Sequence, residues 1–314
     1  MKITNLVNKN QKKLYGFDET FKEISSLHIK NKLPKKIILS GQKGIGKATL
    51  AYHLINFIFS KNEEYNYNLN EFEINELNRS FNLVKNNCHP NLHVIDLLDK
   101  KKMIEIDQIR QMISYSNKSS FNNKERIILI DKVELLNKNA LNSLLKIVEE
   151  PNSNTYFILI LDSNNTILET LKSRCLKFNL FLTFKKSLEI TNKIIKDDVV
   201  KIINSNLLHH YSTPGHYIEL IKFSKLNDVD LKKTDLKSFL LYLIENSYYK
   251  KDNFINDCIY QYIQFYLLKL INRDNSKNIN KIYKKFIEKI SNMQKYNLDQ
   301  ESFFIDLKAS LFDG

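Results

Sequence analysis

The chain has 314 residues, of which 43% are apolar, and its formal net charge at pH 7 is +13. This length predicts about two domains with a sizeable buried core. No apolar run approaches the roughly 18 residues that span a bilayer, and the first residues carry no apolar signal region, so we expect a soluble cytoplasmic protein.

The first half of the chain is predicted to alternate strands and helices. Expected strands are 36–40, 92–96, 126–131, 156–161 and 176–180, and expected helices are 18–31, 48–58, 106–115 and 139–150. Strands that are apolar throughout and alternate with helices predict a parallel sheet covered on both faces. The stretch 60–90, rich in Asn and Glu, predicts a linker or an exposed helical insertion.

After residue 184 only helices are expected. Their predicted ranges are 185–207, 215–224, 229–248, 252–272, 277–292 and a last helix near 299–311. The helix from Phe254 to Ile271 is apolar nearly all round, which predicts burial in a bundle or in a subunit interface.

The positive charge is scattered rather than gathered in one stripe. Short basic runs occur only at 100–102 and 250–251, whereas a groove binder usually concentrates its basic residues. Abundant Lys, Asn and Ile with scarce Gly is also typical of AT-rich coding. The charge therefore does not decide between nucleic-acid binding and a compositional bias.

The most informative segment is a phosphate-binding loop of the form G-x-x-x-x-G-K, from Gly41 through Gly44 and Gly46 to Lys47. Backbone N–H groups around these glycines would cradle phosphates, and Lys47 would add a positive charge. The alternative is a glycine-rich turn matched by chance. The loop holds three of the chain's 6 glycines and stands between a predicted strand and helix, which favours a phosphate loop.

The loop ends in Ala48, where a Ser or Thr normally ligates Mg²⁺. Thr49 does not replace that hydroxyl, because one residue along a helix turns by about 100°. The site is therefore predicted to be degenerate. It leaves ATP or ADP binding open, and no cofactor is expected to be required.

Asp131 closes an apolar strand, as a Mg²⁺-binding aspartate does in ATPases of this kind. The alternative is a strand-end carboxylate in a turn. With the phosphate loop upstream, we expect both at the carboxyl ends of neighbouring parallel strands. Lys132 follows where a catalytic Glu is usual, and the next carboxylate is Glu134. Ala48 and Lys132 together predict that hydrolysis is lost.

Five segments together resemble the bacterial clamp-loader ATPases of the AAA+ class. Their residues are Lys32–Ala51, Asp107–Arg110, Ile127–Asp131, Asn139–Pro151 and Ser173–Cys175. The Ser-Arg-Cys triplet and the helix ending Val-Glu-Glu-Pro are the most specific of them. By motif the resemblance covers roughly residues 14–225, and the remainder is similar only in being helical and in length.

The resemblance implies an α/β RecA-like AAA+ domain over 1–183, a helical lid over 184–235 and an all-α collar over 236–314. It implies a stator subunit in a hetero-pentamer with motor ATPase and delta subunits of the DNA polymerase III holoenzyme. Such a complex loads the sliding clamp on primed DNA, with no membrane involved. The chain itself is expected to have no polymerase activity and little or no ATPase activity.

The resemblance also implies a role for Arg174, as an arginine finger supplied in trans to a neighbour's γ-phosphate. Without the family, an exposed Arg is usually a solvated surface residue. Two departures stand out. Cys88 is alone where many relatives carry a four-cysteine zinc module, and Cys175 and Cys258 lie far from it, so neither zinc nor a disulfide is expected. His216 stands where active members often carry an arginine.

Two alternatives stay open. An active clamp-loader motor ATPase is disfavoured by Ala48 and Lys132. A phosphate-loop kinase or transferase acting on a small molecule is disfavoured by the helical second half and the Ser173–Cys175 triplet.

Overall fold

The structure is a computed structural model that describes residues 8–98, 101–118, 121, 124–149, 154–209, 212–273, 277–296 and 299–311. It forms two compact units, which we describe separately. The first comprises Met1–Ile194 with Thr213–His216, and the second comprises Ile195–Ser212 with Tyr217–Gly314. The predicted three-part division at residues 183 and 235 stays a prediction.

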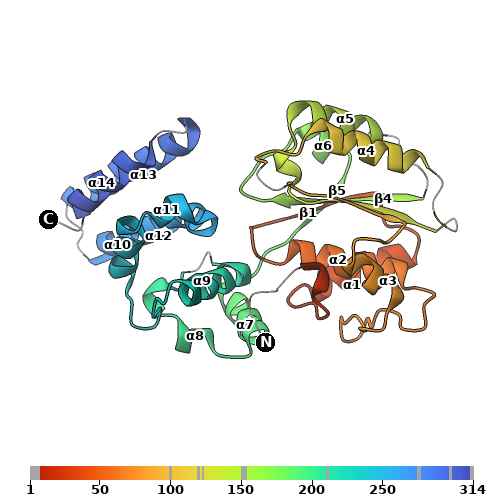
Figure 1. The fold of residues 1–314 in the computed structure, drawn as a ribbon, viewed down its shortest axis with the longest axis horizontal. Coiled ribbons are helices and arrows are strands. Elements are labelled where there is room, and N and C mark those ends of the chain that lie inside the picture. The colour runs from red at the N-terminus through yellow and green to blue at the C-terminus, as the bar shows by residue number, and fades with distance from the viewer. Residues whose placement is uncertain are drawn as a thin grey trace. The chain divides into compact units, whose positions relative to one another are not determined.

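The first unit is built on a five-stranded sheet in the order β2-β3-β4-β1-β5 (Figure 1). Every strand pair is parallel, which confirms the predicted parallel α/β architecture. The strands are β1 (Lys36–Gly41), β2 (Leu92–Ile95), β3 (Arg126–Ile130), β4 (Thr155–Asp162) and β5 (Leu176–Asn179).

Helices cover both faces of this sheet, as Figure 1 shows. One face carries α1 (Asp18–Ile29), α2 (Lys47–Phe59) and α3 (Arg79–Lys85), and the other carries α4 (Ile106–Asn117), α5 (Lys138–Glu149) and α6 (Glu169–Lys172). Successive strand residues point to opposite faces. Ile37 and Leu39 accordingly join the core with α1 and α2, whereas Ile38 joins the core with α4 and α5. This two-sided burial explains why the strands are apolar throughout.

The stretch 60–90 is not a linker, so that alternative was wrong; it is a largely exposed segment that carries α3 and is held by buried anchors. Tyr67, Ile74 and Phe81 are buried in the first core. Asn78, only 1% exposed, caps α3 by accepting from the Phe81 N–H at 2.6 Å, and its amide donates to Glu63 Oε2 at 2.8 Å. A few apolar anchors and a buried polar network thus order a segment whose composition is mostly polar.

The second unit and the residues leading to it are helical, and no strand follows β5 in the described part of the chain. The helices are α7 (Phe184–Ile195), α8 (Val199–Ile202), η5 (Ser205–Leu207), α9 (Pro214–Leu226), α10 (Leu236–Glu245), α11 (Tyr248–Lys251), α12 (Asn253–Arg273), α13 (Lys277–Tyr296) and α14 (Gln300–Leu311). None of the described helices is long and apolar enough to cross a bilayer.

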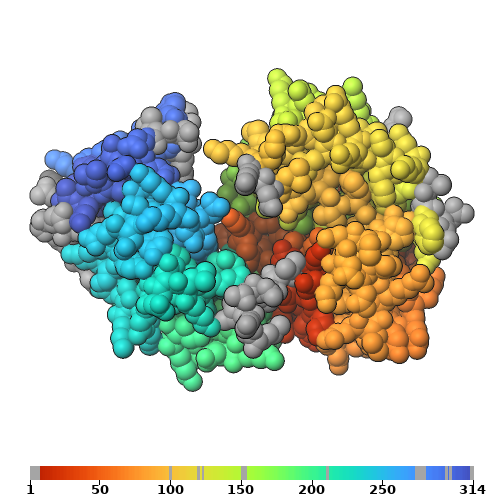
Figure 2. Space-filling view, in the orientation of Figure 1, coloured from red at the N-terminus to blue at the C-terminus, as the bar shows by residue number. Residues whose placement is uncertain are grey.

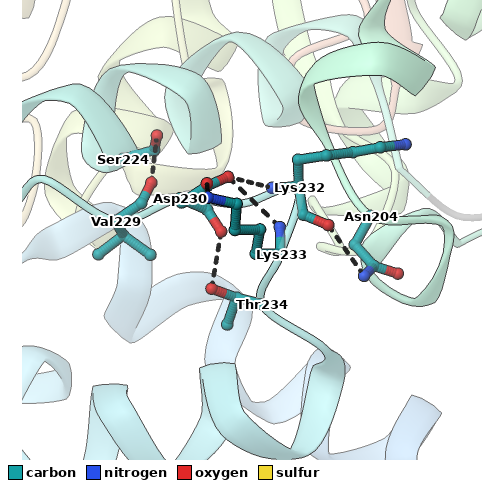
Figure 3. Close-up of polar contacts among 7 residues, drawn as sticks. All are labelled: Asn204, Ser224, Val229, Asp230, Lys232, Lys233 and Thr234. Carbon is teal, nitrogen blue, oxygen red and sulfur yellow. Dashed lines mark hydrogen bonds and ion pairs between the residues drawn. The ribbon is translucent and has the colours of Figure 1, made fainter.

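Two helix predictions in this region were wrong. The expected helix 185–207 is three short ones, because Lys196 adopts a left-handed φ of 58° that ends α7 and Asp198 caps a new start. The expected start at 229 is delayed to α10 by a hydrogen-bonded turn (Figure 3). Asp230 Oδ1 accepts from the Lys232 N–H at 3.0 Å, and Thr234 Oγ1 donates to the Asp230 carbonyl at 2.7 Å.

The apolar helix α12 is buried mainly within its own unit, so the bundle alternative is confirmed. Ile255, Ile259, Tyr262 and Ile263 are all 0% exposed, and α12 contacts α10, α11 and α13. Its apolar side chains are therefore largely buried by other helices of the same chain, although Leu268 is 43% exposed.

Candidate functional site

The phosphate loop stands between β1, which ends at Gly41, and α2, which begins at Lys47, as the motif requires. Gly44 and Gly46 have φ values of +82° and +102°. Only glycine adopts this left-handed region without strain. The predicted strand–loop–helix setting of the motif is therefore confirmed.

Lys47 is turned onto the loop itself. Its ammonium donates to the Gly41 carbonyl at 2.6 Å and to the Gln42 carbonyl at 2.8 Å, and the residue is only 8% exposed. Burial lowers the pKa of Lys47, which nearby Asp162, Glu134 and Asp131 partly offset. The charge expected to meet a phosphate is thus satisfied by the chain's own carbonyls.

Residues Thr213–His216, which belong to the first unit, lie against the loop. Thr213 Oγ1 donates to the Lys43 carbonyl at 2.9 Å, and the Gly215 N–H donates to the Gly44 carbonyl at 2.9 Å. A Cβ added to Gly44 would lie 2.5 Å from Thr213 Oγ1. This closure was not predicted, because the segment was noted only for carrying His216 in place of an arginine.

Asp131 directly follows β3 and so lies at the same edge of the sheet as the loop. It is not on a neighbouring strand, as had been expected, because β4 stands between β3 and β1. Burial raises the pKa of Asp131, and the nearby Asp96 raises it further. Lys132 adopts a left-handed φ of 58°, and its ammonium pairs with Asp96 Oδ1 at 2.9 Å.

These residues do not fit a hydrolytic magnesium–nucleotide centre. Ala48 brings no hydroxyl to the first turn of α2, and Thr49 faces about 100° away around the helix axis. Lys132 places a cation where a carboxylate would polarise water. Among the described residues, no group of three or more His, Cys, Asp and Glu side chains is arranged to hold a metal ion.

The Ser173–Cys175 triplet connects α6 to β5. Cys175 is half-buried against the core beneath α5 and α6, and burial raises the pKa of its thiol to about 11. Ser173 Oγ donates to the Thr170 carbonyl at 3.1 Å. The residue between them, Arg174, has a side chain 37% exposed and pairs with Glu149 at 3.0 Å. The triplet is therefore anchored at both ends, with its arginine at the surface.

Arg174 lies near the N-terminal ends of the strands, whereas the loop follows their C-terminal ends. Leu176, two residues later, pairs with Ile37 at the start of β1, whereas the loop begins at Gly41. At about 3.3 Å per residue, Ile37 and Gly41 are roughly 13 Å apart along the strand. Arg174 lies further away still, so its side chain does not serve the phosphate loop of its own chain.

Comparison with known proteins finds similar chains. The family model for "DNA polymerase III, delta subunit" matches residues 16–183. A DNA polymerase III subunit delta' from Buchnera aphidicola subsp. Baizongia pistaciae is 33% identical over 168 residues, 52% of this chain and 48% of the relative. A subunit gamma from Buchnera aphidicola subsp. Schizaphis graminum is 28% identical over 236 residues, 71% of this chain and 61% of the relative.

A solved structure of a DNA polymerase III gamma subunit-related protein from Thermotoga maritima is 15% identical, covers 91% of this chain and 97% of its own, and has a TM-score of 0.45. The chain spans about half the length of the delta' relatives that it matches first. Because the family model covers more than half of its residues, the chain belongs to the DNA polymerase III delta subunit family, together with the delta-prime subunits of bacterial clamp loaders.

Proposed function

We propose that the chain is the non-hydrolysing stator of a clamp loader. It would assemble with motor ATPase and delta subunits into a hetero-pentamer that loads the sliding clamp on primed DNA in the cytoplasm. Its relatives named as DNA polymerase III delta' subunits support this role. So does the phosphate loop, which has lost its magnesium-binding hydroxyl at Ala48.

We further propose that Arg174 acts as an arginine finger in trans. The observation that carries this proposal is the position of Arg174 at the sheet edge opposite its own loop, on a triplet anchored by Cys175. A planar guanidinium stabilises the charge that spreads over a transferring phosphoryl group, with a fork of donors that an ammonium lacks. The proposal therefore assigns Arg174 to a phosphate carried by a neighbouring subunit.

The role requires no cofactor or zinc in this chain. ATP or ADP would have to displace Lys47 from the Gly41 and Gln42 carbonyls. Hydrogen bonds to a charged group contribute about 1.5–3 kcal/mol each. Breaking these two hydrogen bonds therefore opposes nucleotide binding at this loop. A nucleotide bound there would lack the Mg²⁺-binding hydroxyl and the carboxylate that hydrolysis requires.

An Arg174→Ala variant in a complex reconstituted with its motor and delta subunits tests the finger. DNA-stimulated ATP hydrolysis should slow, by less than the ~10³–10⁵ attributed to a finger at one site, because other motor sites keep their own. Arg174→Lys should restore only part of the rate. Assembly, as measured by gel filtration, should be unchanged, since the Arg174→Ala substitution removes no core contact.

The matched control is Arg79→Ala, because Arg79 is likewise exposed in the first unit and lies on α3. This variant should hydrolyse ATP at the wild-type rate. A wild-type rate with Arg174→Ala would contradict the finger role.

The 28% identity to a gamma subunit over 71% of the chain supports a second candidate, an active motor ATPase. Phosphate release by the isolated chain with Mg²⁺ distinguishes the two. The stator proposal expects turnover far below the ~1 s⁻¹ floor of typical enzymes. Turnover above that floor that Lys47→Ala abolishes would favour the motor.

A further inference from the structure

The guanidinium of Arg174 is held from two sides within its own unit. Nη2 lies 3.0 Å from Glu149 Oε1, and Nη1 donates to the Thr170 carbonyl at 2.7 Å and lies 3.4 Å from Ser173 Oγ. A guanidinium has five N–H donors. Within the described residues, the hydrogen bonds of this guanidinium all come from Nη1, and Nη2 meets Glu149 as an ion pair, so the Nε side is left to face a further acceptor such as a phosphate oxygen.

Glu149 is supplied by a rigid element. It is the last residue of α5, whose inner face is formed by Ala140, Leu144 and Val148. All three are 0% exposed, so the backbone that carries Glu149 is fixed by the core.

The placement of Glu149 opposes the local electrostatic preference. A carboxylate at the C-terminal end of a helix is unfavourable, because the helix dipole is negative there. The paired guanidinium of Arg174 offsets this cost. A locally unfavourable charge that meets a candidate functional side chain is a typical sign of a functional constraint.

We propose that Glu149 is a positioning residue for Arg174. Its carboxylate holds the guanidinium in one orientation, so that the remaining donors meet the nucleotide of the neighbouring subunit. The proposal rests on the finger role of Arg174 proposed above. An arginine loses much rotamer freedom when it is ordered, and the ion pair with Glu149 orders it before the neighbour's phosphate arrives.

The test is a double-mutant cycle in the reconstituted clamp loader, with kcat and KM for ATP measured in the presence of primed DNA and clamp. Glu149→Ala should lower kcat about two- to fivefold, the range of exposed ion pairs, and leave KM unchanged. Glu149→Gln, which keeps an acceptor oxygen, should recover part of the loss. In the double variant, Glu149→Ala should add nothing to the effect of Arg174→Ala.

The matched control is Glu169→Ala, which breaks the neighbouring exposed pair with Lys172 at 2.6 Å. It should leave kcat unchanged, and all variants should melt within a few degrees of the wild type. If Glu149→Ala leaves kcat unchanged or raises it, the positioning role is wrong while the finger stands. The same holds if Glu149→Ala lowers kcat further in the double variant than Arg174→Ala does alone. If Arg174→Ala alone has no effect, the finger and the positioning role both fail.

Discussion

The contact between Gly215 and the phosphate loop can be tested by Gly215→Ala, because two physical effects predict opposite results. Gly215 is the second residue of α9. On helix propensity alone, Ala in place of Gly should stabilise by up to about 1 kcal/mol. A Cβ at this position, however, would lie 2.7 Å from the Gly44 Cα and 2.8 Å from the Gly44 carbonyl oxygen.

The steric effect should win. Both clashing atoms are backbone atoms of a loop that is already in a left-handed conformation at Gly44. Overpacking of this kind costs typically about 1–3 kcal/mol, and the loss of the bond from the Gly215 N–H to the Gly44 carbonyl adds about 0.5–1.5 kcal/mol. The net expectation is a destabilisation of about 1–3 kcal/mol.

Differential scanning calorimetry of the full chain measures the effect. For a unit of this size, 1 kcal/mol shifts Tm by about 2–4 °C, so Tm should fall by about 2–12 °C. Lys185→Ala is the control, since Lys185 is exposed and is the second residue of α7. An unchanged or higher Tm for Gly215→Ala would refute the closed loop.

Two further predictions concern stability. Asp131→Asn should raise Tm at pH 7. Burial raises the folded-state pKa of Asp131, so folding favours its protonated form. The stability that this contributes is complete below the usual pKa of 3.8 and is lost as the pH rises through the raised pKa, where the buried carboxylate is charged. The gain should therefore disappear in melts taken towards pH 3.8, and a fall in Tm at pH 7 would contradict the burial argument. Asn78→Ala should cost about 2–3 kcal/mol, because α3 loses its cap and the partners of Asn78 are left unpaired. Urea unfolding against exposed Asn75→Ala as control measures it, and equal midpoints would refute it.

The strands of the first unit could be predicted from sequence because burial on both faces imposes a continuous apolar run. The 126–130 run and its neighbours needed no tertiary information to be identified. Strand order does depend on tertiary packing, and so the position of β4 between β1 and β3 was not anticipated. The same limit applied to the stretch 60–90, where isolated apolar anchors such as Tyr67 and Ile74 carry the order.

The candidate site was predictable only where a motif is contiguous. The phosphate loop and the Ser173–Cys175 triplet are both local patterns. The residues that contact these two motifs come from other segments of the chain. Thr213–Gly215 bond to the loop, and Glu149 pairs with Arg174. A hydrogen bond or ion pair between segments far apart in the chain leaves no periodicity that a sequence pattern could detect.

The central claim is that this subunit contributes an arginine to a neighbour and does not hydrolyse ATP at its own loop. The most direct measurement is DNA-stimulated ATP hydrolysis by two reconstituted complexes, one with Lys47→Ala and one with Arg174→Ala in this chain. The account predicts a wild-type rate with Lys47→Ala and a reduced rate with Arg174→Ala. A reduced rate with Lys47→Ala and a wild-type rate with Arg174→Ala would contradict it.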